Sequence, residues 1–200
     1  MKNELIYCSD SPVSLRRAAL KAALSLSAGW LAGSCGLAAA KSPDSATPPS
    51  PAQRESSAPP LPEPGSVLVL PQLDLLGGGV FRPDQAKGQI TVLYWWASTC
   101  PFCAEQSPEM QKLWQANQGR GLQLLTLSVD RTADEARAYL RKKSYTFPSI
   151  WVNAAVHQSL PKPKGLPVTV VLGRDGRVIQ ADKGQMFAED VAQLADLLSK

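Results

Sequence analysis

Two cysteines, Cys100 and Cys103, lie two residues apart in the run YWWASTCPFCAEQSP. Pro101 suits the first position of a helix, where its missing N–H costs nothing. Cys100 would then cap that helix, so that unpaired backbone N–H groups and the positive end of the helix dipole face its sulfur and stabilise a thiolate. Motifs of this kind lower the pKa of a cysteine from about 8.5 to between about 3.5 and 7.5. Because Cys103 lies on the next turn, the pair is interpreted as a redox couple in which Cys100 attacks and Cys103 releases.

The same two thiols could instead hold a metal or form a structural bridge. A structural zinc site takes four ligands, and the sequence offers no second Cys-x-x-Cys and one histidine, His157. A disulfide that closes so short a loop contributes little stability. Copper(I) is the stronger alternative, because it selects soft sulfur ligands and Met110 or Met186 could supply a third one. The redox interpretation is favoured, and neither a metal nor a cofactor is expected.

The charge of the chain argues against a nucleic-acid partner. The sequence carries 21 basic and 17 acidic side chains, a net charge of +4. The excess is not gathered into a basic stripe with interleaved aromatic residues, which is the electrostatic footprint of proteins that bind DNA or RNA. We therefore expect no nucleic acid among the partners of this protein.

The elements that would position the cysteines lie in residues 67–200, which are expected to form one domain. The run QITVLYWWA at 89–97 is apolar on both faces, as in a strand covered on both sides, and ends just before Cys100. The other elements are expected as strands at 67–75, 79–81, 122–129, 167–173 and 177–182 and as helices at 101–118, 131–143 and 187–199. This order predicts an α/β fold, a thioredoxin-like mixed β-sheet flanked by helices on both faces and preceded by a short N-terminal β-hairpin.

Residues 1–40 have the features of an export signal. Arg16 and Arg17 precede an apolar stretch of eleven residues, from Ala22 to Ala32. Such a stretch suits the core of a signal peptide, because a helix that spans a bilayer needs about 20 apolar residues. The paired arginines resemble a twin-arginine signal, although paired arginines also occur in ordinary export signals.

Two cleavage sites compete, and a linker follows them. Cleavage is expected either after Ala40, in the run AAA, or before Cys35, because LAGSC resembles a bacterial lipobox. Lipidation of Cys35 is favoured, since it accounts for a thiol without a partner in an oxidising compartment. Residues 41–66 hold eight prolines and six serines. Such a segment cannot bury enough apolar surface to offset the entropy of ordering it, so a disordered tether is expected.

Several separated features of residues 67–200 match one known family. Trp96 lies four residues before the first cysteine, Pro108 follows the couple within the same helix, and GLPVTVVLGRDGRV contains a G-x-P, a strand and an Asp-Gly turn. In these features the chain resembles the TlpA/ResA-like, DsbE/CcmG-related, thiol:disulfide oxidoreductases of the thioredoxin superfamily. The resemblance implies that Pro167 is a cis-proline packed against the couple and that the backbone of Leu166 pairs with a substrate strand.

The resemblance also implies a function and a location. The chain would be an exported enzyme that reduces disulfides of periplasmic proteins through a Cys100–Cys103 dithiol/disulfide cycle. Its partners would be protein thiol or disulfide clients, such as apocytochrome c or proteins that build copper centres, and a membrane thiol electron donor. It would be periplasmic and tethered to a membrane as a lipoprotein. A disulfide-forming oxidant and a copper(I)-binding chaperone that uses the same cysteines remain open as alternatives.

Two positions depart from the pattern of that family. The family commonly carries Glu six residues after the first cysteine, where this chain has Gln106, and Glu105 lies one residue earlier. One step along a helix turns about 100°, so Glu105 is expected to face elsewhere. Either Gln106 forms hydrogen bonds without charge, or Glu105 is a solvated side chain. Phe102 within the motif is less usual in the family and resembles the CPFC of glutaredoxins, which leaves the redox potential open.

Overall fold

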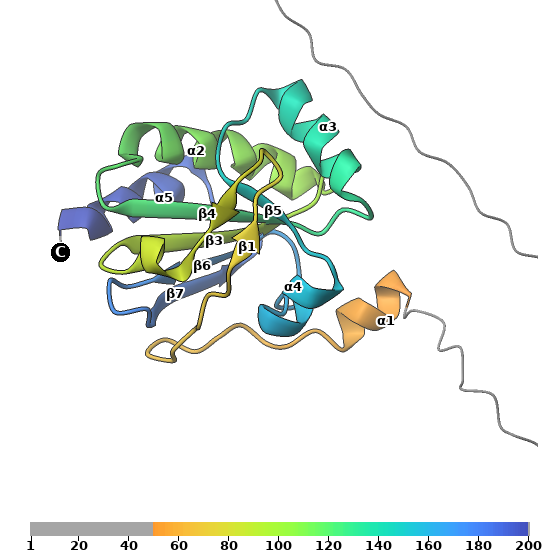
Figure 1. Ribbon diagram of the computed structural model, residues 1–200, viewed down its shortest axis with the longest axis horizontal. Helices are drawn as coiled ribbons and strands as arrows, with labels where there is room; N and C mark the ends of the chain where they lie inside the picture. The colour runs from red at the N-terminus through yellow and green to blue at the C-terminus, as the bar shows by residue number, and fades with distance from the viewer. Residues whose placement is uncertain (1–49, 200) are drawn as a thin grey trace, which may run out of the picture. The chain divides into compact units, whose positions relative to one another are not determined.

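The computed structural model describes residues 50–199 (Figure 1). A mixed five-stranded sheet forms its centre, with the strand order β5-β4-β3-β6-β7. The strands are β3 (Ile90–Trp96), β4 (Leu122–Ser128), β5 (Ser149–Trp151), β6 (Val168–Leu172) and β7 (Val178–Lys183). The expected export signal, Cys35 and residues 41–49 of the expected tether lie outside the described residues.

Strand β3 is the middle strand of this sheet. All seven of its residues are buried, as expected for a strand that is covered on both faces. It runs parallel to β4, with Trp96 opposite Ser128, and antiparallel to β6, with Trp95 opposite Val168. The end of β3, the end of β4 and the start of β6 therefore lie at the same end of the sheet.

A two-stranded antiparallel sheet precedes β3 in the chain. Its strands are β1 (Leu73–Asp74) and β2 (Val80–Phe81), and Leu73 pairs with Phe81. The turn between them contains Gly78 and Gly79, with φ values of 95° and 82°, a backbone region that favours glycine. Each strand is two residues long, shorter than the first strand expected from the sequence.

Helices lie on both faces of the central sheet (Figure 1). Those in the described part of the chain are α1 (Pro51–Ser56), α2 (Pro101–Asn117), α3 (Ala133–Lys143), α4 (Ala154–Ser159) and α5 (Ala188–Gln193), with 3₁₀ segments η1 (Pro83–Ala86) and η2 (Leu194–Ser199). Within residues 50–199, none of them combines the length and the apolar character that crossing a membrane would require.

The core consists of two clusters, one on each face of the sheet. One cluster joins Val92 and Tyr94 of β3 to apolar residues of α2, α3 and α5. The other joins Leu93 and Trp95 of β3 to the β1–β2 hairpin and to Val156 of α4. Alternate residues of β3 thus face opposite clusters, as the period of a strand requires. This arrangement confirms the predicted mixed sheet with helices on both faces.

Two short elements between α3 and β6 are missing from the sequence prediction. Strand β5 has three residues and pairs with β4 at the edge of the sheet. Helix α4 has six residues and begins after Asn153, whose side chain accepts a hydrogen bond from the N–H of Val156. Elements of this length leave no periodic pattern of apolar residues. The last predicted helix, 187–199, is α-helical only as far as Gln193 and continues as η2.

Residues 50–66, which belong to the segment expected to be a disordered tether, contact the domain in this structure. Glu55 of α1 accepts hydrogen bonds from Lys162 Nζ at 2.9 Å and from the N–H of Gly165 at 2.6 Å. Further along, the N–H of Gly65 donates to a carbonyl of β7. A segment whose composition does not support a fold of its own is thus held by partners that are distant in sequence.

The side chain of Gln111 fixes α2 to the loop before β5. Its Oε1 accepts from the backbone N–H groups of Thr146 and Phe147 at 2.8 and 3.3 Å, and its Nε2 donates to Thr146 Oγ1 at 2.7 Å. Gln111 and Phe147 are both buried. Removing the amide would therefore leave the N–H of Phe147 without a partner in the core, whereas exposed Thr146 can form hydrogen bonds with water.

We expect Gln111→Leu to lower the free energy of unfolding by about 2 kcal/mol, the cost of leaving the buried N–H of Phe147 unsatisfied. Urea denaturation of the oxidised protein measures this loss. Lys112→Ala, at the next position of the helix, is the control, because its ammonium group is exposed and its ion pair with Glu109 contributes less than about 1 kcal/mol. Equal losses in the two variants would contradict the role assigned to Gln111.

Candidate active site

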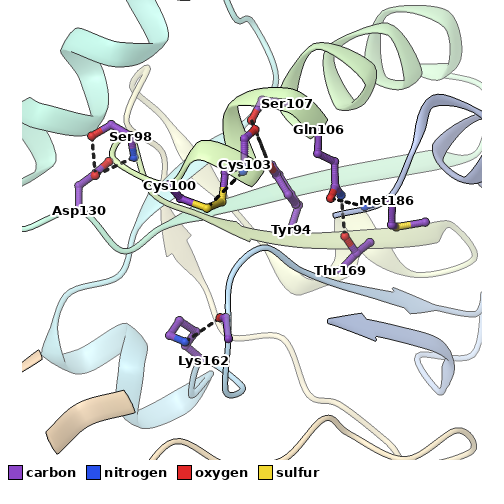
Figure 2. Close-up of a disulfide and its surroundings, with 11 residues drawn as sticks. Tyr94, Ser98, Cys100, Cys103, Gln106, Ser107, Asp130, Lys162, Thr169 and Met186 are labelled. Carbon is purple, nitrogen blue, oxygen red and sulfur yellow. Dashed lines mark hydrogen bonds between the residues drawn. A yellow bond between two sulfur atoms is a disulfide. The ribbon is translucent and has the colours of Figure 1, made fainter. Parts of the chain in front are cut away.

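Cys100 and Cys103 form a disulfide at the junction between β3 and α2 (Figure 2). Their Cα atoms are 5.2 Å apart. Cys100 is the N-cap of α2, Pro101 occupies its first turn, and the N–H of Cys103 donates to the Cys100 sulfur at 3.2 Å. When the disulfide is reduced, the same N–H group and the helix dipole favour negative charge on the Cys100 sulfur.

The two cysteines differ in exposure. Cys103 is 1% exposed and belongs to the core cluster on the α2 face of the sheet, whereas Cys100 is partly exposed. Pro101 and Phe102, which lie between them in the chain, are exposed. Another protein can therefore reach Cys100 but not Cys103 without a change in structure.

Two buried hydroxyl groups lie beneath the first turn of α2 (Figure 2). The Ser107 hydroxyl donates to the carbonyl of Cys103 at 2.7 Å. The Tyr94 hydroxyl donates to the same carbonyl at 3.2 Å and lies 3.0 Å from Ser107 Oγ. Burial raises the pKa of Tyr94, and the hydrogen bond with Ser107 offsets part of this effect. Tyr94 therefore stays neutral near neutral pH and links β3 to the turn that carries the disulfide.

Asp130, which the sequence analysis did not single out, holds the loop that leads into Cys100. One of its carboxylate oxygens accepts from the N–H and the hydroxyl of Ser98, at 2.9 and 2.7 Å (Figure 2). The other accepts from the hydroxyl of Ser128 at 2.8 Å, and its backbone carbonyl accepts from the Trp151 indole at 2.9 Å. The one signal in the sequence is that Asp130 follows β4, whose end adjoins the end of β3.

The structure places Gln106 in the core and Glu105 on the surface. Gln106 is 0% exposed, and its Nε2 donates to Thr169 Oγ1 at 3.0 Å (Figure 2). Its Oε1 accepts from the N–H of Met186 at 2.9 Å. Glu105 is exposed. Gln106 thus joins α2 to β6 and to the segment before α5 through uncharged hydrogen bonds.

The residues considered as further metal ligands differ in how far they are buried. Met110 and Met186 are buried in the core cluster that contains Cys103. His157 lies on α4 and is exposed. Among residues 50–199, no three or more His, Cys, Asp or Glu side chains are grouped so that they could hold a metal ion.

The turn before β6 lies at the same end of the sheet as the disulfide. The peptide bond between Leu166 and Pro167 is cis. Since Val168 is opposite Trp95, Pro167 extends β6 toward the end of β3, where Trp96 leads into the cysteine loop. The side chain of Leu166 packs against both core clusters. Within the described residues, neither its N–H nor its C=O has a hydrogen-bond partner.

Trp96 packs the end of β3 against α3. It is 1% exposed, and its ring centroid lies 5.4 Å from that of Tyr139. Tyr145 and Phe147 continue this series of aromatic rings. Burial, followed by the neighbouring Tyr139, raises the pKa of Tyr145 to about 12. The indole N–H of Trp96 has no hydrogen-bond partner in the described part of the chain, so the contribution of Trp96 to the site is packing.

Comparisons of the sequence with known proteins find thiol chemistry among its relatives. The AhpC/TSA family matches residues 68–181, more than half of the chain. Thiol-disulfide oxidoreductase ResA of Bacillus thuringiensis subsp. konkukian (strain 97-27) is 27% identical over 117 residues, which cover 57% of this chain and 64% of ResA. Sporulation thiol-disulfide oxidoreductase A of Bacillus subtilis (strain 168) is 23% identical over 148 residues, 72% of this chain and 86% of that protein. This chain thus spans slightly less than two thirds of the length of ResA.

Comparisons with solved structures show the fold. A putative thiol:disulfide interchange protein DsbE from Chlorobium tepidum superposes with a TM-score of 0.60 at 22% identity, over 68% of this chain and 98% of that one. StoA from Bacillus subtilis superposes with a TM-score of 0.55 at 20% identity, over 67% of this chain and 99% of that one. The expected resemblance to ResA-like and DsbE-like proteins, with the thioredoxin-like fold that it implies, is confirmed.

Tyr94→Phe should lower the free energy of unfolding by about 1 kcal/mol near neutral pH, because it removes one buried hydrogen-bonding hydroxyl. This loss should shrink above about pH 10, where the phenol ionises in the unfolded chain. The folded phenol keeps its proton, since its pKa is raised, so the wild-type protein loses stability as the pH rises, and the variant lacks this contribution. Urea denaturation at a series of pH values measures the difference.

Ser107→Ala is the matched control for that series. It removes a hydroxyl from the same hydrogen-bonded group but keeps the phenol, so its stability should fall with pH at least as steeply as that of the wild type. A difference between the wild type and Tyr94→Phe that stays constant to about pH 11 would contradict the raised pKa of Tyr94.

Proposed function

We propose that this chain, which belongs to the AhpC/TSA family, is a thiol:disulfide oxidoreductase that reacts with other proteins through Cys100 and Cys103. The observation that carries the proposal is the asymmetry of the couple. The N–H of Cys103 points at the sulfur of the partly exposed Cys100, while Cys103 itself is buried. One sulfur is thus accessible and favoured as a thiolate, and the other is shielded until the first has reacted.

The proposed cycle begins with the reduced protein. The Cys100 thiolate attacks one sulfur of a client disulfide, so that a mixed disulfide forms, the client S–S bond breaks, and the second client sulfur leaves and takes up a proton. Cys103 then loses its proton and attacks the Cys100 sulfur, which forms the Cys100–Cys103 disulfide and releases the first client sulfur as a thiol. Two electrons pass to the client. A dithiol donor reduces the couple again by the reverse exchange.

The proposed direction of this exchange is reduction of the client. The family resemblance of the sequence motifs favours this direction and, with it, the proposed partners. These are periplasmic clients such as apocytochrome c or proteins that build copper centres, and a membrane thiol carrier as the dithiol donor. Phe102, an unusual residue for that family, is the feature that favours the opposite direction, an oxidant of client thiols.

The cysteine variants test the proposed activity in the full-length protein, with insulin as the disulfide and dithiothreitol as the donor. Cys100→Ser should slow the reduction of insulin by about a hundredfold or more, because it removes the attacking group. Cys103→Ser, reduced beforehand and then freed of dithiothreitol, should accumulate a mixed disulfide between Cys100 and insulin, visible on a non-reducing gel. Cys35→Ser is the control and should react as the wild type does. Unchanged activity in Cys100→Ser would refute the proposal.

The equilibrium potential of the couple, titrated against glutathione and dithiothreitol, decides the direction of this same reaction. A potential of about −250 mV or below matches thioredoxin-type reductants and supports the proposed reduction of clients. A potential of about −120 mV matches a strong oxidant and would contradict the proposed direction. Copper(I) binding in a protein that does not reduce insulin would favour the chaperone instead.

We also propose that the protein is exported and held at a membrane by a lipid on Cys35. The support is the apolar stretch after the twin arginines and the LAGSC run. In cells, the wild-type protein should appear in the membrane fraction and Cys35→Ser in the soluble periplasmic fraction. The same distribution for both proteins would contradict the lipid anchor, and release of both would agree with cleavage after Ala40.

A further inference from the structure

A groove of about 550 Å³ lies beside the couple, at the turn that precedes β6. Three large apolar side chains line it, Phe102, Leu166 and Phe187. Phe102 and Phe187 are 58% and 64% exposed, so the groove presents apolar surface to solvent. Exposed apolar groups that gather at one place mark surfaces where another molecule binds. Phe102 stands between the two cysteines in the chain, so the groove that it lines adjoins the couple.

The backbone at the groove can pair with an extended segment at one residue. The N–H of Gly165 is engaged by Glu55 at 2.6 Å, and its C=O accepts from Lys162 at 2.9 Å. The N–H and C=O of the next residue, Leu166, have no partner within residues 50–199. An extended chain that crosses the groove could satisfy both groups, as in the addition of a strand to a sheet edge.

Two lysines give the groove a positive charge. Lys164 and Lys183 both line it, and within the described residues neither ammonium group has an ion pair or a hydrogen bond. Lys183 is held close to the turn, because a Cβ on Gly165 would come within 2.8 Å of its Cγ and Cδ. Its chain neighbour Asp182 accepts a hydrogen bond from Gln180. Both cations are therefore available to a partner.

The one carboxylate that lines the groove does not neutralise these lysines. Glu55 accepts from Lys162 Nζ at 2.9 Å and from the N–H of Gly165. Burial raises the pKa of Glu55, but these hydrogen bonds and the charges of Lys162 and Lys164 outweigh burial and lower it overall. Glu55 is thus ionised and paired with Lys162. With Lys164 and Lys183 included, three lysines stand against one glutamate, a local net charge of +2.

The pairing of Leu166 with an extended segment is already implied by the family resemblance; we infer that this groove also selects client segments by their side chains, favouring a large apolar side chain next to the reacting cysteine and carboxylates beside it. The apolar side chain would pack against Phe102, Leu166 and Phe187, and the carboxylates would approach Lys164 and Lys183. Charges at the rim of an interface change the rate of association more than the final affinity, so the selection should appear in the rate of exchange. The inference rests on the proposed function, since it concerns the substrates of the same couple.

Short peptides test the inference with the full-length, reduced protein. Each peptide carries one cysteine as a mixed disulfide with thionitrobenzoate. The Cys100 thiolate attacks the peptide sulfur and releases coloured thionitrobenzoate, and Cys103 then displaces the peptide as a thiol. Three peptides of equal length are compared: one with leucine and glutamates beside the cysteine, one with leucine and lysines, and one with serine and glutamates. The second-order rate constant is measured at low and high salt.

The peptide with leucine and glutamates should react about tenfold faster than its lysine counterpart at low salt, and the ratio should approach one at high salt, where charges are screened. In the double variant Lys164→Glu/Lys183→Glu the order of the two peptides should reverse. The double variant Lys87→Glu/Lys112→Glu has the same net charge but changes residues outside the groove lining, and it should keep the wild-type order.

A variant of Phe187 tests whether the apolar side chain of the peptide binds in the groove. Phe187 precedes α5, is exposed, and makes no side-chain hydrogen bond as its cap, so Phe187→Ala should fold. In this variant the leucine and glutamate peptide should lose most of its advantage over the serine and glutamate peptide. An undiminished advantage would show that the apolar side chain does not bind here.

Equal rates for the acidic and basic peptides, or an order that Lys164→Glu/Lys183→Glu leaves unchanged, would overturn the selection by charge. These outcomes leave the proposed oxidoreductase intact, because thionitrobenzoate is still released. If the proposed function is wrong, no peptide will react faster with the wild-type protein than with Cys100→Ser. The two failures are therefore distinguishable in one set of measurements.

Discussion

The structure depends on one short hydrogen-bonded junction, where the last residues of β3 give way to the first turn of α2. A helix that begins at Cys100 directs the N–H of Cys103 at its sulfur, and this contact exists only if the turn keeps its place on the sheet. Three groups of side chains hold it there. Tyr94 ties the turn to β3 from below, Asp130 holds the loop on the entry side, and Gln106 joins the helix to β6.

The groups that hold the buried side of the couple are neutral. Gln106 contributes an uncharged amide, and the hydroxyls of Tyr94 and Ser107 stay protonated near neutral pH. The electrostatic contribution to the couple from this side therefore consists of dipoles, namely the first turn of α2 and the side chains around it. The electrostatic environment of a couple that is surrounded by dipoles changes less with pH and salt concentration than that of a couple beside an ionised carboxylate.

The elements of the fold that were predicted correctly are those that local patterns in the sequence specify. The seven buried residues of β3, the helix after Pro101 and the last hairpin were expected, because periodicity, proline and Asp-Gly are local signals. The role of Asp130 could not be predicted, since it depends on Ser98, a loop residue 32 positions away. The contact of Glu55 with Gly165 joins residues 110 positions apart, and a proline-rich composition by itself predicts no docking.

The contact between Glu55 and Gly165 affects where the chain meets its clients. The helix that bears Glu55 directly follows the upstream chain in the sequence and lies against the rim of the groove, so the first described residues are held on the reactive side of the domain. If that upstream chain is fastened to a surface, clients on the same surface meet the couple as if they were part of one molecule. Their encounter then depends on an effective concentration set by the length of the linker rather than on diffusion through the whole compartment.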